Sequence, residues 1–390
     1  MTQNIFRITL QAVSKIEQFT AELRGPPSRR PPSRLWPRET GEALEKVLNL
    51  RVGEVVEVRS AEEILATLDE RGAYESLPFM PEMLRFCGRR FRVYRRADKA
   101  CDTIDWGVLR RMENAVHLDG LRCDGSAHGG CQAGCLIYWK EAWLKRVTPS
   151  AAEGAVGPAP AAAPGAPVRT GATLETLSRA TEKGELNGKT LYSCQATELV
   201  NATAEELPWW LPGQYIQDIR SGNATSRRVV RGLLIGLLNK FQKANRRFAP
   251  RFTLIHGGNE YPFLRGRANG GPREERLNLQ PGELVEVKSK EEILDTLDEG
   301  DKTRGLRFDR EMLQYCGRRG RVLRRVEHII DEKTGRMLTI KADCIIIEGF
   351  ICTGDYHRMC PRSIFPYWRE SWLRRIEGPS QPAAPAQATS

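Results

Sequence analysis

A stretch of 100 residues occurs twice in this chain of 390 residues. Shifting the sequence by 229 positions aligns Leu48–Val147 with Leu277–Ile376 without a gap, and 43 of the 100 aligned positions are identical. Identity this high over this length indicates a duplicated domain, which has to be recognised before any other fold assignment. Two diverged copies also show which residues each copy needed to keep.

Both copies keep a Cys-x4-His-x2-Cys motif, and both keep a cysteine inside Cys-Gly-Arg-Arg at the same distance upstream. Three thiolates and one imidazole are the ligand set of a closed, tetrahedral, structural zinc site. The sequence therefore predicts two zinc sites, one in each copy. The predicted ligands are Cys87, Cys123, His128 and Cys131 in the first copy, and Cys316, Cys352, His357 and Cys360 in the second.

Other interpretations of these cysteines remain open. In an iron–sulfur site Cys135 would supply a further thiol in the first copy, but Ile364 stands at that position in the second. Unliganded core thiols are another interpretation. Disulfides are disfavoured, because the N-terminus lacks the basic start and unbroken apolar run of a secretory signal. A reducing, cytoplasmic location is the expectation.

The first copy carries three reactive side chains that the second copy lacks, namely Cys101, His117 and Cys135. A thiol nucleophile with a histidine base would make the chain an enzyme, or an accessory protein to one, in a bacterial biosynthetic pathway. No third orienting group is evident, so drift at non-essential positions is the simpler interpretation. The sequence also lacks the glycine-rich phosphate loops and the nucleophile-elbow motif of common enzyme families.

Short strands and short helices alternate within each copy and predict an α+β domain. Ser60 and Glu63 form the Ser-x-x-Glu pattern of a helix capping box, and Ser289 and Glu292 repeat it in the second copy. Each copy closes on a Tyr-Trp-x-Glu-x-Trp-Leu segment. Its tryptophans are predicted to fill the core rather than to stack on nucleic-acid bases. They are Trp139, Trp143, Trp368 and Trp372.

This order of elements resembles an SH3-like small barrel, and the two-copy pattern resembles an uncharacterised bacterial protein family with no known activity. The resemblance implies two homologous β-rich barrels with short helices, joined by a linker and a small helical module. The expected domains are an N-terminal helix and Pro/Arg-rich arm (1–47), the first metal-binding repeat (48–147), an Ala/Pro/Gly linker (148–172), a helical middle module (173–276), the second metal-binding repeat (277–376) and a disordered tail (377–390).

Within the middle module, apolar residues at helical spacing predict a helix whose apolar stripe is core. The stripe consists of Val229, Leu233, Leu234, Leu237, Leu238 and Phe241. A basic amphipathic helix that binds a membrane or an acidic partner is the alternative.

The formal net charge of +11 favours an anionic partner, either nucleic acid or an acidic protein surface. No apolar run approaches the roughly 20 residues of a membrane span, so a membrane partner is not expected. We therefore predict a non-catalytic, zinc-stabilised binding or scaffold protein. One basic edge per barrel would bind the polyanion through Arg89, Arg90, Arg92, Arg95, Arg318, Arg319, Arg321 and Arg324.

Overall fold

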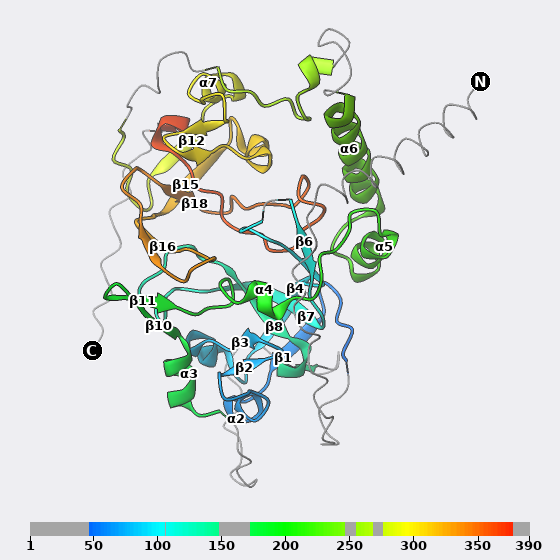
Figure 1. Cartoon of the computed structure of the whole chain (residues 1–390), viewed down its shortest axis with the longest axis vertical. Helices are drawn as coiled ribbons and strands as arrows, with labels where there is room; N and C mark the ends of the chain where they lie inside the picture. Colours follow the sequence, from blue (N-terminus) through cyan, green and yellow to red (C-terminus); the bar gives the residue numbers. More distant parts are fainter. Residues whose placement is uncertain (1–46, 106, 148–171, 246–254, 268–275, 377–390) are drawn as a thin grey trace, which may run out of the picture. The chain divides into compact units, whose positions relative to one another are not determined.

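The computed structural model describes residues 47–105, 107–147, 172–245, 255–267 and 276–376, all of which belong to the unit Lys46–Ser390 (Figure 1). The fold is mixed α+β with many short strands, few helices and a half-barrel sheet, which confirms the predicted class at that level. The predicted N-terminal helix and arm, the C-terminal tail and nearly all of the linker lie outside the described residues.

The first copy is built around one antiparallel sheet of five strands in the order β8-β7-β4-β1-β9. Two short hairpins and three short helices surround this sheet. The elements are β1 (Val55–Val58), α2 (Ala61–Leu65), β2 (Ala73–Tyr74), β3 (Leu77–Pro78), the 3₁₀ helix η1 (Pro81–Phe86), β4 (Arg90–Arg96), β5 (Lys99–Cys101), β6 (Leu109–Arg111), β7 (Ala115–Arg122), β8 (Leu136–Lys140), η2 (Glu141–Trp143) and β9 (Leu144–Arg146).

The second copy repeats this order with a sheet of four strands, β18-β15-β12-β19. Its register is the same, since Val55 pairs with Arg92 in the first copy and Leu284 pairs with Arg321 in the second. The elements are β12 (Leu284–Val287), α7 (Lys290–Leu294), β13 (Lys302–Thr303), β14 (Leu306–Arg307), η6 (Arg310–Tyr315), β15 (Arg319–Arg325), β16 (His328–Ile330), β17 (Met337–Thr339), β18 (Ile345–Ile347), η7 (Glu370–Trp372) and β19 (Leu373–Arg375).

The outermost strand β8 differs between the copies. In the second copy its counterpart is reduced to a single bridge between Ile345 and Trp368. Pro366 stands there at the position of Ile137 and has no N–H to donate to a ladder. In the first copy the Gln195 side chain lies along β8, where its Oε1 accepts from the Tyr138 N–H (2.8 Å) and its Nε2 donates to the Tyr138 carbonyl (2.9 Å).

Each copy has its own aromatic core. The rings of Phe79 and Trp143 meet edge-on with centroids 5.2 Å apart, and their counterparts Phe308 and Trp372 do the same at 5.2 Å. All four tryptophans of the closing segments are fully buried, which confirms their predicted place in the core. Both predicted capping boxes are also present.

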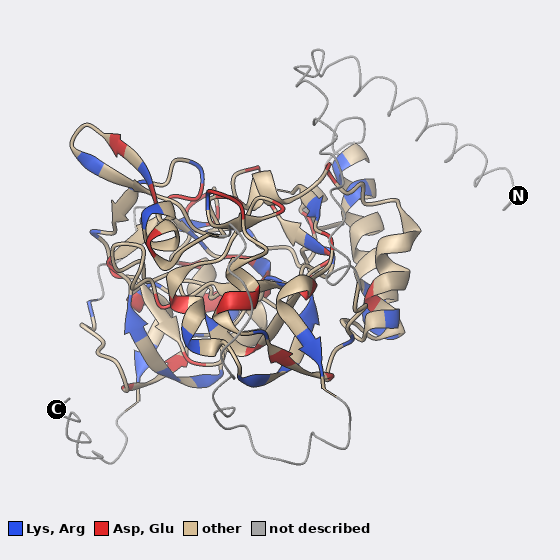
Figure 2. Ribbon diagram, turned by 90° about the horizontal axis from the view of Figure 1, so that it is seen from below, with Lys and Arg blue, Asp and Glu red and all other residues tan. Residues whose placement is uncertain are grey.

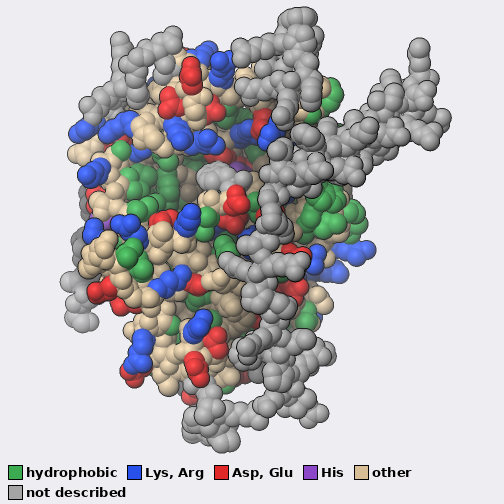
Figure 3. Space-filling model, in the orientation of Figure 1, with side chains coloured by type: hydrophobic (Ala, Val, Ile, Leu, Met, Phe, Trp, Pro, Cys, Tyr) green, Lys and Arg blue, Asp and Glu red, His purple; other side chains and the backbone are tan. Residues whose placement is uncertain are grey.

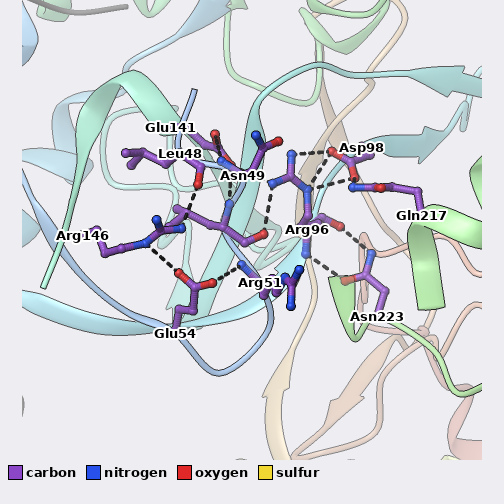
Figure 4. Close-up of polar contacts among 11 residues, drawn as sticks. Leu48, Asn49, Arg51, Glu54, Arg96, Asp98, Glu141, Arg146, Gln217 and Asn223 are labelled. Atoms are coloured by element: carbon purple, nitrogen blue, oxygen red, sulfur yellow. Dashed lines mark hydrogen bonds and ion pairs between the residues drawn. The ribbon is translucent and has the colours of Figure 1, made fainter. Parts of the chain in front are cut away.

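A buried carboxylate joins the beginning of each copy to its end, and Figure 4 shows the network of the first copy. Glu141 accepts from the backbone N–H groups of Asn49 and Leu50, both at 2.9 Å, and pairs with Arg96 Nη1 at 2.8 Å. Arg96 is itself buried and donates to the Leu50 carbonyl. Glu370 makes the matching contacts in the second copy. This network holds the two ends of each repeat together.

The segment between the copies is mostly helical, but it also contains a hairpin that the sequence did not predict. Its elements are α3 (Leu174–Ala180), β10 (Glu182–Leu186), β11 (Lys189–Tyr192), α4 (Leu199–Ala202), α5 (Pro212–Ser221), α6 (Ser226–Asn245) and η5 (Ile255–Gly258).

The prediction that the apolar stripe of α6 is core was wrong for Leu234, Leu237 and Phe241. Val229 is buried, but Leu234 is 62% exposed and Phe241 is 61% exposed. Figure 3 shows hydrophobic side chains gathered at the surface over α5 and α6. Helical spacing reveals that a helix has an apolar face, but it does not show what covers that face.

Candidate metal centre

The first copy brings Glu82, Cys123 and His128 together. Glu82 lies in η1, Cys123 directly follows β7, and His128 lies in the loop after it. One potential ligand atom from each residue lies within 4.8 Å of the other two. Glu82 Oε1 is 3.0 Å from Cys123 Sγ and 3.2 Å from His128 Nδ1. The three residues are therefore close enough to hold one metal ion.

The loop that carries this group closes tightly at a glycine. Gly125 has a φ of +77°, and a Cβ placed there would lie 2.0 Å from the carbonyl oxygen of Cys131. Gly354 occupies the same position in the second copy, with a φ of +83° and a Cβ distance of 2.5 Å to the oxygen of Cys360. Only glycine fits this conformation without strain. The glycine shared by both motifs is thus explained by loop closure.

The group in the first copy is buried and short of hydrogen bonds. His128 is 1% exposed and Glu82 is 7% exposed. Both ring nitrogens of His128 and Oε2 of Glu82 lack a hydrogen-bond partner among the described residues. His128 Nδ1 and Glu82 Oε1 are in contact without hydrogen-bond geometry, as two ligands of a shared cation would be. Burial and the Glu82 charge raise the pKa of the Cys123 thiol, which donates to Glu82.

The second copy brings together the equivalent residues Glu311, Cys352 and His357 within the same distance limit. Here the polar atoms have partners. His357 Nε2 lies 3.2 Å from Asp309 Oδ1. Burial opposes protonation of His357, but the hydrogen bond and charge of Asp309 outweigh it and raise the pKa of His357 to about 9.

The two upstream cysteines predicted as ligands lie outside these groups. Cys87 packs against the core of the first copy and Cys316 against that of the second. Burial raises the pKa of each thiol to about 11. Within the described residues, the carboxylates of Glu82 and Glu311 approach the Cys/His loops instead.

The last cysteine of each motif also lies outside its group. Cys131 lines a cavity of about 40 Å³ together with Cys123, His128, Cys135 and Cys194. Cys360 instead contacts the first copy, where its Sγ lies 3.1 Å from the Sγ of Cys101. The two copies therefore place the same motif cysteine in different surroundings.

The residues of the alternative enzyme prediction contact different partners. His117 is fully buried, its Nδ1 lies 2.9 Å from the Ile137 carbonyl oxygen, and burial lowers its pKa to about 3. Cys101 packs against Cys360, and Cys135 lines the cavity described above. The hydrogen bonds of the described residues include none between His117 and either thiol.

Many of the predicted polyanion-binding arginines make contacts within their own sheet. Arg90 pairs with Glu57 at 3.3 Å, and its counterpart Arg319 pairs with Glu286 at 3.0 Å. Figure 2 shows basic and acidic positions interspersed along the strands. The remaining predicted residues are distributed as follows: Arg92 and Arg321 donate to the carbonyls of Gly53 and Gly282, Arg95 donates to that of Thr353, Arg89 and Arg318 lie near the rings of Phe91 and Tyr315, and Arg324 is half-buried.

Comparisons of the chain with protein-family models, with curated proteins and with solved structures found no match. Among the described helices, none has both the length and the apolar character needed to cross a membrane.

The role of Glu82 and Glu311 was missed at the level of sequence, although a signal existed. Both belong to a Glu-Met-Leu segment that the two copies share. Asp309 left no such signal, because Met80 stands at the equivalent position.

Proposed function

We propose that this chain is a non-catalytic scaffold protein, stabilised by zinc, that binds an acidic protein partner. The observation that carries the metal part is the buried Glu82, Cys123 and His128 group, in which three polar atoms lack partners. Burying polar groups without partners is costly, and a cation would satisfy the Glu82 carboxylate and one nitrogen of the His128 ring at once. Carboxylate, thiolate and imidazole are ligands that zinc accepts.

The contact distances support zinc at this group. Zinc bonds of about 2.0–2.3 Å place the ligand atoms of a tetrahedral site about 3.3–3.7 Å apart. The observed 3.0 and 3.2 Å to Glu82 Oε1 lie just below that range, so the ligand atoms would separate slightly around a bound ion. Cys131 is the proposed fourth ligand, because it lines the same cavity as Cys123 and His128. Four protein ligands would leave no open position, which makes the site structural rather than catalytic.

The proposal also includes the finer features expected from the sequence. We infer that each copy is an SH3-like barrel, supported by the matching strand register, and that the protein works in the reducing cytoplasm, supported by ten free cysteines. In such small barrels a metal that ties η1 to the loop after β7 would contribute directly to folding.

The partner part rests on α6. Val230, Leu234, Leu237 and Phe241 are each more than half exposed and follow one another at spacings of four, three and four residues. This spacing places them on one face of the helix. Exposed basic residues flank the face on both sides, including Arg227, Arg231 and Lys240. An amphipathic helix with acidic flanks complements such a surface in both shape and charge.

Elemental analysis of the full chain, purified without added metal, tests the metal part. We expect bound zinc, and we expect His128→Ala to reduce it. Iron with visible thiolate absorption, or metal content unchanged by His128→Ala, would contradict the assignment. For the partner part, a labelled amphipathic peptide with acidic flanks should bind more tightly than the same peptide with basic flanks. That binding should weaken with added salt and with Leu234→Lys.

A further inference from the structure

We infer that the two copies have diverged in how they close the same loop, so that the first copy requires a metal ion and the second closes it with hydrogen bonds. The inference rests on the proposed zinc binding and assigns it to one copy. It predicts one tightly bound metal ion per chain instead of two.

In the second copy the Glu311 carboxylate already accepts hydrogen bonds from the loop. Its Oε2 accepts from the N–H of Thr353 (3.0 Å), the hydroxyl of Thr353 (2.7 Å) and the N–H of Gly354 (3.1 Å). Its Oε1 accepts from the N–H of Tyr356 at 2.6 Å. These four hydrogen bonds take up most of the acceptor capacity of a carboxylate. They hold the loop against η6 without a cation.

The histidine of the second copy also has a partner of its own. His357 Nε2 contacts the carboxylate of Asp309, the residue that precedes η6. The equivalent residue in the first copy is Met80. A thioether is only a weak acceptor and cannot replace a carboxylate. Among the described residues neither ring nitrogen of His128 makes a hydrogen bond, and Nδ1 contacts Glu82 Oε1 instead.

A second substitution removes the one side-chain donor that the loop offers to this carboxylate in the second copy. Asp124 stands where the second copy has Thr353, so the hydroxyl donor is replaced by a negative charge. Asp124 turns to Arg85 at 2.6 Å and accepts from the Ser126 N–H at 3.0 Å. The contacts of Glu82 Oε1 in the group are the thiol and imidazole themselves, and its Oε2 has no partner among the described residues.

The two groups therefore differ in how many existing interactions a metal ion would have to replace. In the first copy the ion would find three converging ligand atoms and would replace one thiol hydrogen bond and the contact of His128 with Glu82. In the second copy the ion would compete with an ion pair and with four hydrogen bonds that already satisfy the site. Net affinity depends on this difference, so the first copy should bind the ion far more tightly.

The test is to count and locate the metal in matched variants of the full chain. Zinc analysis after dialysis should give one equivalent per chain. His128→Gln should remove it, while the matched variant His357→Gln should leave it in place. Cobalt(II) should produce a thiolate-to-cobalt charge-transfer band that Cys123→Ser weakens and Cys352→Ser leaves unchanged.

Exchanging the diverged residues tests the cause and does not delete any ligand. Met80→Asp with Asp124→Thr gives the first copy the hydrogen-bonding residues of the second, and should lower its cobalt(II) affinity at least about 10-fold, the scale of losses seen for residues that surround metal ligands. Asp309→Met with Thr353→Asp should add a second binding event. Circular dichroism of each variant identifies any that fail to fold.

Three results are distinguishable. Two tight equivalents in the wild-type chain, or loss of the ion with His357→Gln instead of His128→Gln, would overturn the inference and leave the proposed zinc scaffold intact. Absence of any zinc or cobalt(II) binding by the wild-type chain would overturn the proposed function itself. One equivalent that the exchange variants shift as described supports both.

Discussion

Removing the Glu141 carboxylate should destabilise the first copy more than removing Glu370 destabilises the second. The Glu141 side chain is 2% exposed, and its partner Arg96 is 5% exposed. Breaking one side of a buried ion pair costs about 3–5 kcal/mol, and leaving a buried amide such as that of Leu50 unpaired costs about 1–3 kcal/mol. Because Asp98 still pairs with Arg96, we expect Glu141→Ala to lower the free energy of unfolding by about 4 kcal/mol.

The second copy provides an internal comparison. Arg325, the partner of Glu370, is 27% exposed, so water compensates part of its charge when the carboxylate is removed. We expect Glu370→Ala to cost about 2–3 kcal/mol, between the exposed and buried limits. Urea unfolding followed by tryptophan fluorescence gives the total loss, and hydrogen exchange at Leu50 and Leu279 locates it in one copy or the other.

Glu175→Ala is the matched control, because the Arg179–Glu175 pair is about 80% exposed on both sides and should contribute less than about 1 kcal/mol. If Glu141→Ala lies within about 1 kcal/mol of this control, the buried network does not hold the chain ends together and the reasoning is wrong.

Three further predictions concern single positions. Burial lowers the pKa of His117 from its ordinary 6.5 to about 3, so below pH 6.5 the unfolded chain binds a proton that the folded chain does not. The free energy of unfolding should therefore be unaffected above pH 6.5 and fall by about 1.4 kcal/mol per pH unit below it. In urea unfolding measured against pH, His117→Gln should remove this slope. Gly125→Ala should prevent loop closure and abolish zinc binding by elemental analysis, while the wild-type loop retains it. Leu234→Ala and Phe241→Ala should each change the free energy of unfolding by less than about 0.5 kcal/mol, because both side chains are exposed. Losses of several kcal/mol in thermal unfolding would show that these side chains are core residues after all.

The sequence predicted the parts of the fold that both copies had to keep. The capping boxes and the buried tryptophans each depend on a local requirement, and duplication made those requirements visible. The exposure of α6 could not be predicted, because periodicity describes a helix and not its neighbours. Proline at position 366 did carry the information that the outermost strand is interrupted.

The predicted ligand set shows where sequence spacing stops being informative. Glu82 lies near the start of η1 and Cys87 directly follows its end, five residues later. Cys87 has left the helical conformation and packs against the core, whereas Glu82 approaches the Cys/His loop. Sequence alone favoured the residue type more typical of zinc. The carboxylate reaches the loop in the structure.

The contacts of Gln195 bear on how separate chains behave toward one another. An uncovered outermost strand is a template for pairing with another molecule, and it leads to aggregation. In the first copy the Gln195 amide occupies the N–H and carbonyl of Tyr138 that a foreign strand would use. In the second copy the strand at this position is reduced to a single bridge and is too short to pair with a strand of another molecule. The two copies thus prevent strand pairing between molecules at the same sheet edge in two different ways.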